Sequence, residues 1–244
     1  MLPKTLTNER EKTKKESEDK YMKKGLTEIV FILDRSGSMS GLEKDTIGGY
    51  NSMLERQKKE DGEAIISTVL FDDRIEVLHD RENLYEVENI TEDDYYVRGC
   101  TALLDAVGTT IQRIGNTQKE TPEDERPEKT MFIITTDGME NASREYTYSK
   151  VKKLVEEKKK KQHWEFIFLG ANIDAVEVAG RFGVAKNRAV RYECDSAGTK
   201  LNFKMMSKMV SCARASRSAK EMECMMDADE MLAPIREDYE RRHG

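Results

Sequence analysis

Short apolar runs that alternate with helical segments constrain the fold of this chain more than any other feature of its sequence. Glu28–Leu33, Lys129–Thr136 and Glu165–Leu169 have the apolar content of strands that are covered on both faces. Segments with apolar residues at helical spacing lie between them, as in Thr101–Ile114 and Tyr148–Lys161. This alternation predicts an α/β fold with a doubly wound, mostly parallel sheet.

The remaining segments extend the same pattern. Ala64–Phe71 and Arg74–Leu78 have the β-branched and apolar residues of strands and lie on either side of Asp72 and Asp73. Together they predict a hairpin. The other predicted elements are helices at Gly41–Gln57, Asp174–Phe182 and Thr199–Ala213, and a strand at Arg188–Tyr192.

Polarity divides the chain into three parts. Residues 1–26 are mostly polar and charged, and we expect a disordered leader because such a segment has too little apolar surface to bury. Residues 27–217 contain the alternating elements and form the predicted α/β domain. Residues 218–244 are rich in methionine and predict a helical extension that docks either on the domain or on a partner.

Composition excludes several classes of protein. Lys and Arg number 41 against 47 Asp and Glu, so the net charge of −6 gives no global attraction for nucleic acid. No apolar run approaches the roughly 20 residues of a membrane-spanning helix. The first residues lead into charge rather than into an apolar signal core, and the four cysteines form no CxxC pair. We therefore expect a cytoplasmic protein.

Polar side chains follow the predicted strands at the places where an open parallel sheet binds ligands. Asp34, Ser36 and Ser38 come after the first strand, Thr101 precedes a helix, and Asp137 follows a later strand. Two carboxylates and three hydroxyls should therefore meet at one edge of the sheet. Ligands that are all oxygen suit a hard divalent cation, and short hydroxyl arms favour Mg²⁺ over Ca²⁺.

The order of these motifs resembles the von Willebrand factor A domain, from about Thr27 to Arg217. The motifs are Asp-x-Ser-x-Ser, Gly-x-Thr before a helix, and Thr-Asp-Gly. The resemblance implies a six-stranded sheet of order 3-2-1-4-5-6 with one antiparallel edge strand, which fits the hairpin. It also implies that all five residues form a complete metal-ion-dependent adhesion site (MIDAS), in which some ligands bind through water. Mg²⁺ is the expected ion, with Mn²⁺ or Ca²⁺ as alternatives.

The expected function is metal-dependent protein binding without catalysis. An ion held by neutral hydroxyls attracts negative charge at an open position, so a partner protein should offer it a Glu or Asp. Residues near the metal loops form the expected rim of the partner-binding surface: Met39, Tyr95, Tyr96, Arg98 and Met139. Arg35, between the first ligands, is expected to add positive charge beside the site.

Three alternatives remain at this point. A metal-dependent hydrolase or phosphatase-like enzyme would use Asp34 and Asp137, although no nucleophile elbow, phosphate loop or poised histidine accompanies them. An RNA-associated member of the family would use the aromatic and basic residues near Tyr96. In a purely structural role Asp34 would cap the following helix, which leaves Thr101 and Asp137 without an explanation.

Overall fold

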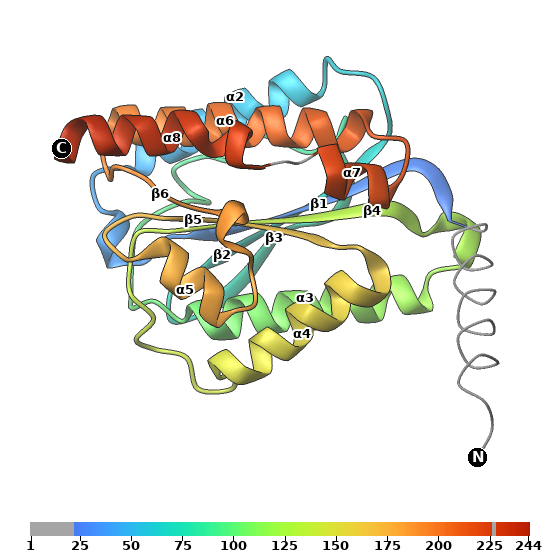
Figure 1. Ribbon diagram of the computed structural model, residues 1–244, viewed down its shortest axis with the longest axis horizontal. Coiled ribbons are helices and arrows are strands. Elements are labelled where there is room, and N and C mark those ends of the chain that lie inside the picture. The colour runs from blue at the N-terminus through green and yellow to red at the C-terminus, as the bar shows by residue number, and fades with distance from the viewer. Residues whose placement is uncertain (1–21, 226–227) are drawn as a thin grey trace.

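A six-stranded sheet with helices on both faces forms the protein (Figure 1). The computed structural model describes residues 22–225 and 228–244. Its strands are β1 (Lys23–Asp34), β2 (Ala64–Phe71), β3 (Ile75–Asn83), β4 (Pro127–Thr136), β5 (Glu165–Gly170) and β6 (Ala189–Arg191). Its α-helices are α2 (Glu43–Gln57), α3 (Leu103–Glu120), α4 (Tyr148–Gln162), α5 (Ala175–Arg181), α6 (Ser196–Ala215), α7 (Ala219–Met225) and α8 (Ala228–His243). Short 3-10 helices span Gly37–Met39, Glu123–Glu125 and Lys186–Arg188.

The strand order is β3-β2-β1-β4-β5-β6, which confirms the predicted topology. Neighbouring strands run parallel except β2 and β3, which form the predicted antiparallel hairpin at one edge. Asp34 pairs with Phe71 of β2, and Leu33 pairs with Thr135 of β4. This register brings the ends of β1, β2 and β4 to the same edge of the sheet, where the loops after them meet.

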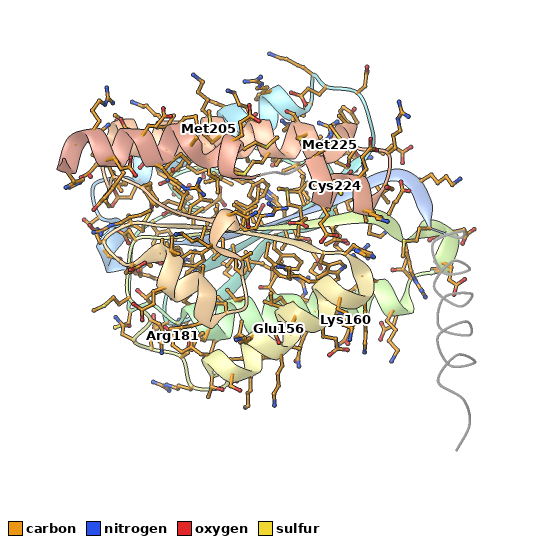
Figure 2. All side chains as sticks on the ribbon, in the orientation of Figure 1. Glu156, Lys160, Arg181, Met205, Cys224 and Met225 are labelled. Carbon is orange, nitrogen blue, oxygen red and sulfur yellow. The ribbon has the colours of Figure 1, made fainter. Side chains whose placement is uncertain are left out.

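The central strand β1 is buried on both faces, because its alternate side chains enter two separate apolar cores. Phe31 and Leu33 belong to the core beneath α2, α6 and α8, whereas Val30 and Ile32 belong to the core that includes α3 and α4. Figure 1 shows these two helix layers on opposite sides of the sheet, and Figure 2 shows side chains filling the space between. The near-continuous apolar run of β1 is therefore the signature of a doubly covered strand.

The C-terminal extension docks on the domain itself. Met222 of α7, and Leu232 and Ile235 of α8, are at most 2% exposed and join the core beneath α6. The last turn of α8 is held by an ion pair between Arg242 and Asp195, the residue that caps the start of α6. Of the two alternatives for docking, the extension packs on the domain, and the boundary at residue 217 does not separate two cores.

Several predicted boundaries are wrong by a few residues. β1 begins at Lys23, so the predicted end of the leader at residue 26 falls inside a strand, while residues 1–21 lie outside the described part of the chain. β3 continues to Asn83 because its pairing with β2 reaches Ile65. α3 starts two residues later than expected and ends at Glu120. In the described part of the chain, no helix combines the length and the apolar character that a membrane crossing requires.

Candidate metal centre

Asp34 lies at the end of β1 and is fully buried. Its Oδ1 accepts a hydrogen bond from the Ser36 backbone N–H at 2.7 Å, and its Oδ2 accepts one from the Thr136 hydroxyl at 2.5 Å. Thr136 was not among the predicted site residues, although it is the first residue of the Thr-Asp-Gly motif. These two bonds fix the carboxylate between the loops that follow β1 and β4.

The three predicted hydroxyl ligands meet in space. Ser36 Oγ lies 3.0 Å from Ser38 Oγ, and the Thr101 hydroxyl donates to Ser36 Oγ at 2.9 Å. Thr101 is 65 positions from Ser36 in sequence, so their contact depends on the sheet edge that brings the two loops together. Three small oxygen donors thus form one continuous cluster.

Asp137 completes the cluster from the loop after β4. The residue is 1% exposed, and its Oδ2 accepts a hydrogen bond from the Cys194 thiol at 3.3 Å. Its Oδ1 is buried and has no hydrogen-bond partner among the described residues. A buried carboxylate oxygen without a partner is costly, so this atom is the clearest indication that the site accommodates a further positive or hydrogen-bonding group.

Gly138 closes the cluster from the side. A Cβ at this position would lie 2.7 Å from Thr101 Oγ1 and 2.9 Å from Ser38 Oγ, closer than real Cβ contacts. Glycine is therefore required for the backbone to approach the hydroxyls this closely. The need for glycine in the Thr-Asp-Gly motif follows from this packing.

Burial shifts the protonation of both carboxyl groups in the same direction. It raises the pKa of Asp34 to about 6, although the hydrogen bonds from Thr136 and Ser36 oppose the shift. It also raises the pKa of Asp137, against smaller opposing effects of Ser38 and Cys194. Each carboxylate therefore lacks compensating positive charge, and a cation between the two would supply it.

The donor set fits a hard divalent cation. Two carboxylates and three hydroxyls provide only oxygen, which Mg²⁺ prefers over nitrogen or sulfur ligands. Within residues 22–225 and 228–244, no cluster of three or more His, Cys, Asp or Glu side chains is arranged to hold a metal. A metal centre in this cluster must therefore rely on the hydroxyls as well as on Asp34 and Asp137.

Cys194 is a second residue that sequence reasoning missed. It lies after β6, far from the metal motifs in sequence, and touches Asp137. Burial and the neighbouring Asp137 charge raise the pKa of the thiol to about 12, so it remains a neutral donor at physiological pH. No local sequence motif predicts this contact, because it depends on the order of β4, β5 and β6 in the sheet.

Two of the five predicted rim residues are buried, and their assignment to a partner-binding surface is wrong. Met39 is 3% exposed, and Tyr95 is 1% exposed with its hydroxyl donating to the Asp34 carbonyl at 2.5 Å. Tyr95 therefore supports the first metal loop from within. Met139 is 72% exposed and Tyr96 is 43% exposed, while Arg98 is partly exposed, so these three remain accessible.

Arg35 does not direct its charge toward the cluster, contrary to expectation. Its side chain is fully buried and its Nε donates to Asp72 Oδ2 at 3.0 Å, while its Nη2 donates to Glu76. Arg98 donates to the same Asp72 oxygen at 2.7 Å. The hairpin between β2 and β3 supplies the acceptors, so the destination of Arg35 depends on a strand that is distant in sequence.

Asp72 and its neighbours hold the Thr101 loop against the first metal loop. The Ala102 N–H donates to the Asp72 carbonyl at 2.8 Å, and the Gly37 N–H donates to the Gly99 carbonyl at 3.1 Å. Burial alone would raise the pKa of Asp72, but hydrogen bonds from Arg98, the Arg74 backbone and Arg35 outweigh it and hold the pKa below its usual range. The ion pairs thus position a loop that carries one of the five oxygen donors.

We expect Gly138→Ala to lower Mg²⁺ affinity about tenfold, a free-energy change of about 1.4 kcal/mol. The added Cβ would push the hydroxyls of Thr101 and Ser38 out of their positions. Isothermal titration with Mg²⁺ measures the change. Gly48→Ala is the matched control, because a Cβ there meets no atom within 4 Å. Unchanged affinity in Gly138→Ala would contradict the proposed arrangement.

Known structures of low sequence identity share this fold. Proximal thread matrix protein 1 from the mussel byssus is 15% identical, with 78% of this chain and 47% of that chain covered and a TM-score of 0.52. A structure of that protein with a zinc-occupied MIDAS motif matches to the same extent. The PilB minor pilin from Streptococcus sanguinis, solved as a mutant, is 11% identical over 76% of this chain and 61% of its own, with a TM-score of 0.51.

These similarities establish the fold, which is of the von Willebrand factor A type, as the resemblance implied. This chain spans about half the length of the mussel protein and 61% of the pilin chain. No family model and no curated protein sequence matches the chain.

Proposed function

We propose that this protein is a metal-dependent protein-binding module. Its metal centre would use Asp34, Ser36, Ser38, Thr101 and Asp137, either directly or through water. Mg²⁺ is the ion that the donor set fits best, with Mn²⁺ or Ca²⁺ as alternatives. The bound ion would supply a Lewis-acidic position that accepts a Glu or Asp side chain from another protein.

The observation that carries this proposal is the unpartnered Oδ1 of buried Asp137 beside three converging hydroxyls. A structural role for the motif would leave that oxygen without a hydrogen bond, at a cost of about 1–3 kcal/mol. A cation removes this cost and also compensates the two buried carboxylates. The zinc-occupied MIDAS motif in the mussel protein supports the proposal by similarity of fold.

The local chemistry favours an acidic partner. Hydroxyl ligands carry no charge, and both oxygens of Asp34 already accept hydrogen bonds from Ser36 and Thr136. Contact of Asp34 with an ion through water would therefore leave positive charge for an incoming carboxylate. Such charge-assisted contacts are among the strongest polar interactions at interfaces.

The residues exposed around the cluster are of types that protein interfaces favour, which supports the proposed contact. Met139, Tyr96 and Arg98 expose apolar, aromatic and cationic groups near the metal loops. A surface hollow of about 900 Å³ adjoins the Thr101 loop, with Cys100 and Asn141 in its lining. Aromatic residues, Met and Arg are enriched at protein interfaces.

The same geometry argues against an enzyme in our proposal. His79 faces Tyr50 inside the core, while His163 and His243 pair with Glu223 and Glu193. Among the described residues, none of these imidazoles donates to or accepts from the cluster, so no histidine is positioned there as a general base. The four cysteines are free thiols, which suits the proposed cytoplasmic setting.

Acetate and Mn²⁺ provide a direct test of both parts of the proposal. We expect Mn²⁺ bound to the wild-type protein to broaden the methyl NMR signal of acetate, since an open position brings the carboxylate close to the paramagnetic ion. Thr101→Ala should abolish most of the broadening, whereas Thr117→Ala at the far end of α3 should not. Absence of Mn²⁺ binding would refute the metal centre, and bound Mn²⁺ without acetate broadening would refute the open position.

A further inference from the structure

A groove separate from the metal cluster runs between α2 and α6. It has a volume of about 490 Å³, and Lys44, Gly48, Met53, Arg56, Phe203 and Lys204 are among its lining residues. Its two helices, α2 and α6, belong to the helix layer that covers one face of the sheet (Figure 1), and we call it the α2–α6 groove. Ligand-binding clefts are typically about 300–1,000 Å³, so its size is sufficient for side chains of a partner.

Two adjacent glycines of α2 shape the groove in different ways. A Cβ at Gly49 would lie 2.3 Å from the Phe203 ring, so this glycine is needed for α6 to approach α2. A Cβ at Gly48 would meet no atom within 4 Å. Glycine inside a helix costs about 1 kcal/mol relative to alanine. The packing of this chain gives no reason for that cost at Gly48, which instead leaves the groove open above the helix backbone.

The groove is positively charged although the chain as a whole is acidic. Asp45 is the one carboxylate among its lining residues. Four cations line it: Lys44, Arg56, Lys200 and Lys204. The groove thus carries a formal charge of +3, from four positive groups and one negative, against −6 for the chain.

Neighbouring acids neutralise these cations only weakly. Lys200 pairs with Asp45 at 3.2 Å, whereas Lys44 and Arg56 lie 4.0 and 3.7 Å from Glu92 and Glu60. All three of these cations are more than half exposed, and exposed ion pairs contribute at most about 1 kcal/mol. Lys204 forms no ion pair with any residue that the structure describes.

We infer that the α2–α6 groove binds an acidic peptide segment of another protein, with an apolar side chain placed over Gly48. Carboxylates of that segment face Lys44, Arg56, Lys200 and Lys204, and its apolar side chain contacts Met53 and Phe203 at the base of the groove. Phe203 is only 5% exposed, so it offers no open ring face on which a nucleic-acid base could stack, and this favours a peptide over a single-stranded nucleic acid. Charge complementarity would speed the encounter and select the partner.

A synthetic peptide of Glu and Ala with two Leu four positions apart is the probe. Its fluorescence anisotropy is measured against the full chain at low salt in EDTA, so that a metal contact does not contribute. We expect binding that Gly48→Leu lowers at least tenfold by filling the groove. Gly48→Leu also removes a helix-interior glycine, so loss of binding through unfolding is not expected. Gly180→Leu is the matched control, because Gly180 is likewise an exposed helical glycine with free space at its Cβ.

Charge variants test the cationic wall. Lys204→Glu should weaken binding at least fivefold, whereas Lys208→Glu, one turn further along α6 and outside the groove lining, should have little effect. Because the assay contains EDTA, binding there does not depend on a metal ion, which separates this site from the proposed metal centre.

Four results would overturn the inference. They are no binding at about 0.1 mM peptide, equal binding by Gly48→Leu, equal binding of a peptide in which Ala replaces both Leu, and stronger binding of a single-stranded RNA of similar charge. The third result would indicate non-specific electrostatic attraction, and the fourth a nucleic-acid site.

Discussion

Mg²⁺ at about 100 times its dissociation constant should stabilise the wild-type chain by about 2.7 kcal/mol, and Asp34→Asn should remove this gain. For a domain of this size the gain corresponds to about 5–10 °C in the midpoint of thermal unfolding. Asparagine keeps the shape of Asp34 and preserves an acceptor for the Ser36 N–H. It removes the negative charge that would hold the ion. Differential scanning calorimetry with Mg²⁺ and with EDTA measures the difference.

The same prediction has a second part, which concerns how the stability of the metal-free protein depends on pH. Because burial raises the pKa of Asp34 to about 6, the folded chain retains a proton between about pH 4 and pH 6 that the unfolded chain has released. The stability of the metal-free wild type should therefore fall as the pH rises through this window. Asp34→Asn should show a smaller fall, since it removes the share of Asp34 and leaves that of Asp137, whose pKa burial also raises.

An exposed aspartate provides the control for this experiment. Asp93→Asn, in the loop before Thr101, should keep both the Mg²⁺ gain and the pH dependence of the wild type. If Asp34→Asn gains as much stability from Mg²⁺ as the wild type, Asp34 does not bind the ion.

Arg35→Met should destabilise the fold by about 3–5 kcal/mol, which is a large effect for a residue that binds no ligand. The substitution leaves Asp72 buried without one of its two guanidinium partners and Glu76 without a short ion pair. The buried Asp72 carboxylate then keeps Arg98 as its one guanidinium partner, and this loss of compensation costs more than a loss of apolar contacts. Urea unfolding monitored by circular dichroism measures the change in free energy.

A double variant and the pH dependence of unfolding test whether the ion pair with Asp72 causes the loss of stability in Arg35→Met. Arg35→Met combined with Asp72→Asn should lose less than the sum of the single changes, because the two side chains interact directly. The low pKa of Asp72 means that its contribution is present at neutral pH and is lost as the pH falls through that pKa. The stability of Arg35→Met should therefore fall less steeply in acid than that of the wild type.

Arg56→Met is the matched control, because Arg56 is an exposed arginine with a long ion pair to Glu60. We expect it to change stability by at most about 0.5 kcal/mol. If Arg35→Met is as stable as the wild type, Arg35 does not contribute to the stability of the ion-pair cluster around Asp72.

The sequence predicted the fold and the five clustered oxygen donors because both depend on local patterns. A strand such as β1 must be apolar on both faces to be covered by two helix layers, and that requirement is visible in Ile29–Leu33. Parallel strands place their carboxyl ends at one edge of the sheet. Because Asp34 and Asp137 each follow a strand, the sequence alone predicts that they lie close together. The glycine of the Thr-Asp-Gly motif follows from the close backbone approach at Gly138.

Only the tertiary structure decided which side chains near the cluster face solvent and which support it. Met39, Tyr95 and Arg35 all lie within or beside the metal loops, yet each is buried. Tyr95 and Arg35 find their hydrogen-bond partners on elements that are distant in sequence. Cys194 reaches Asp137 through the order of the strands, and the C-terminal helices dock on α6 through a core that no local motif encodes. Local periodicity fixes which face of an element is apolar, whereas the partner of a buried polar group depends on long-range packing.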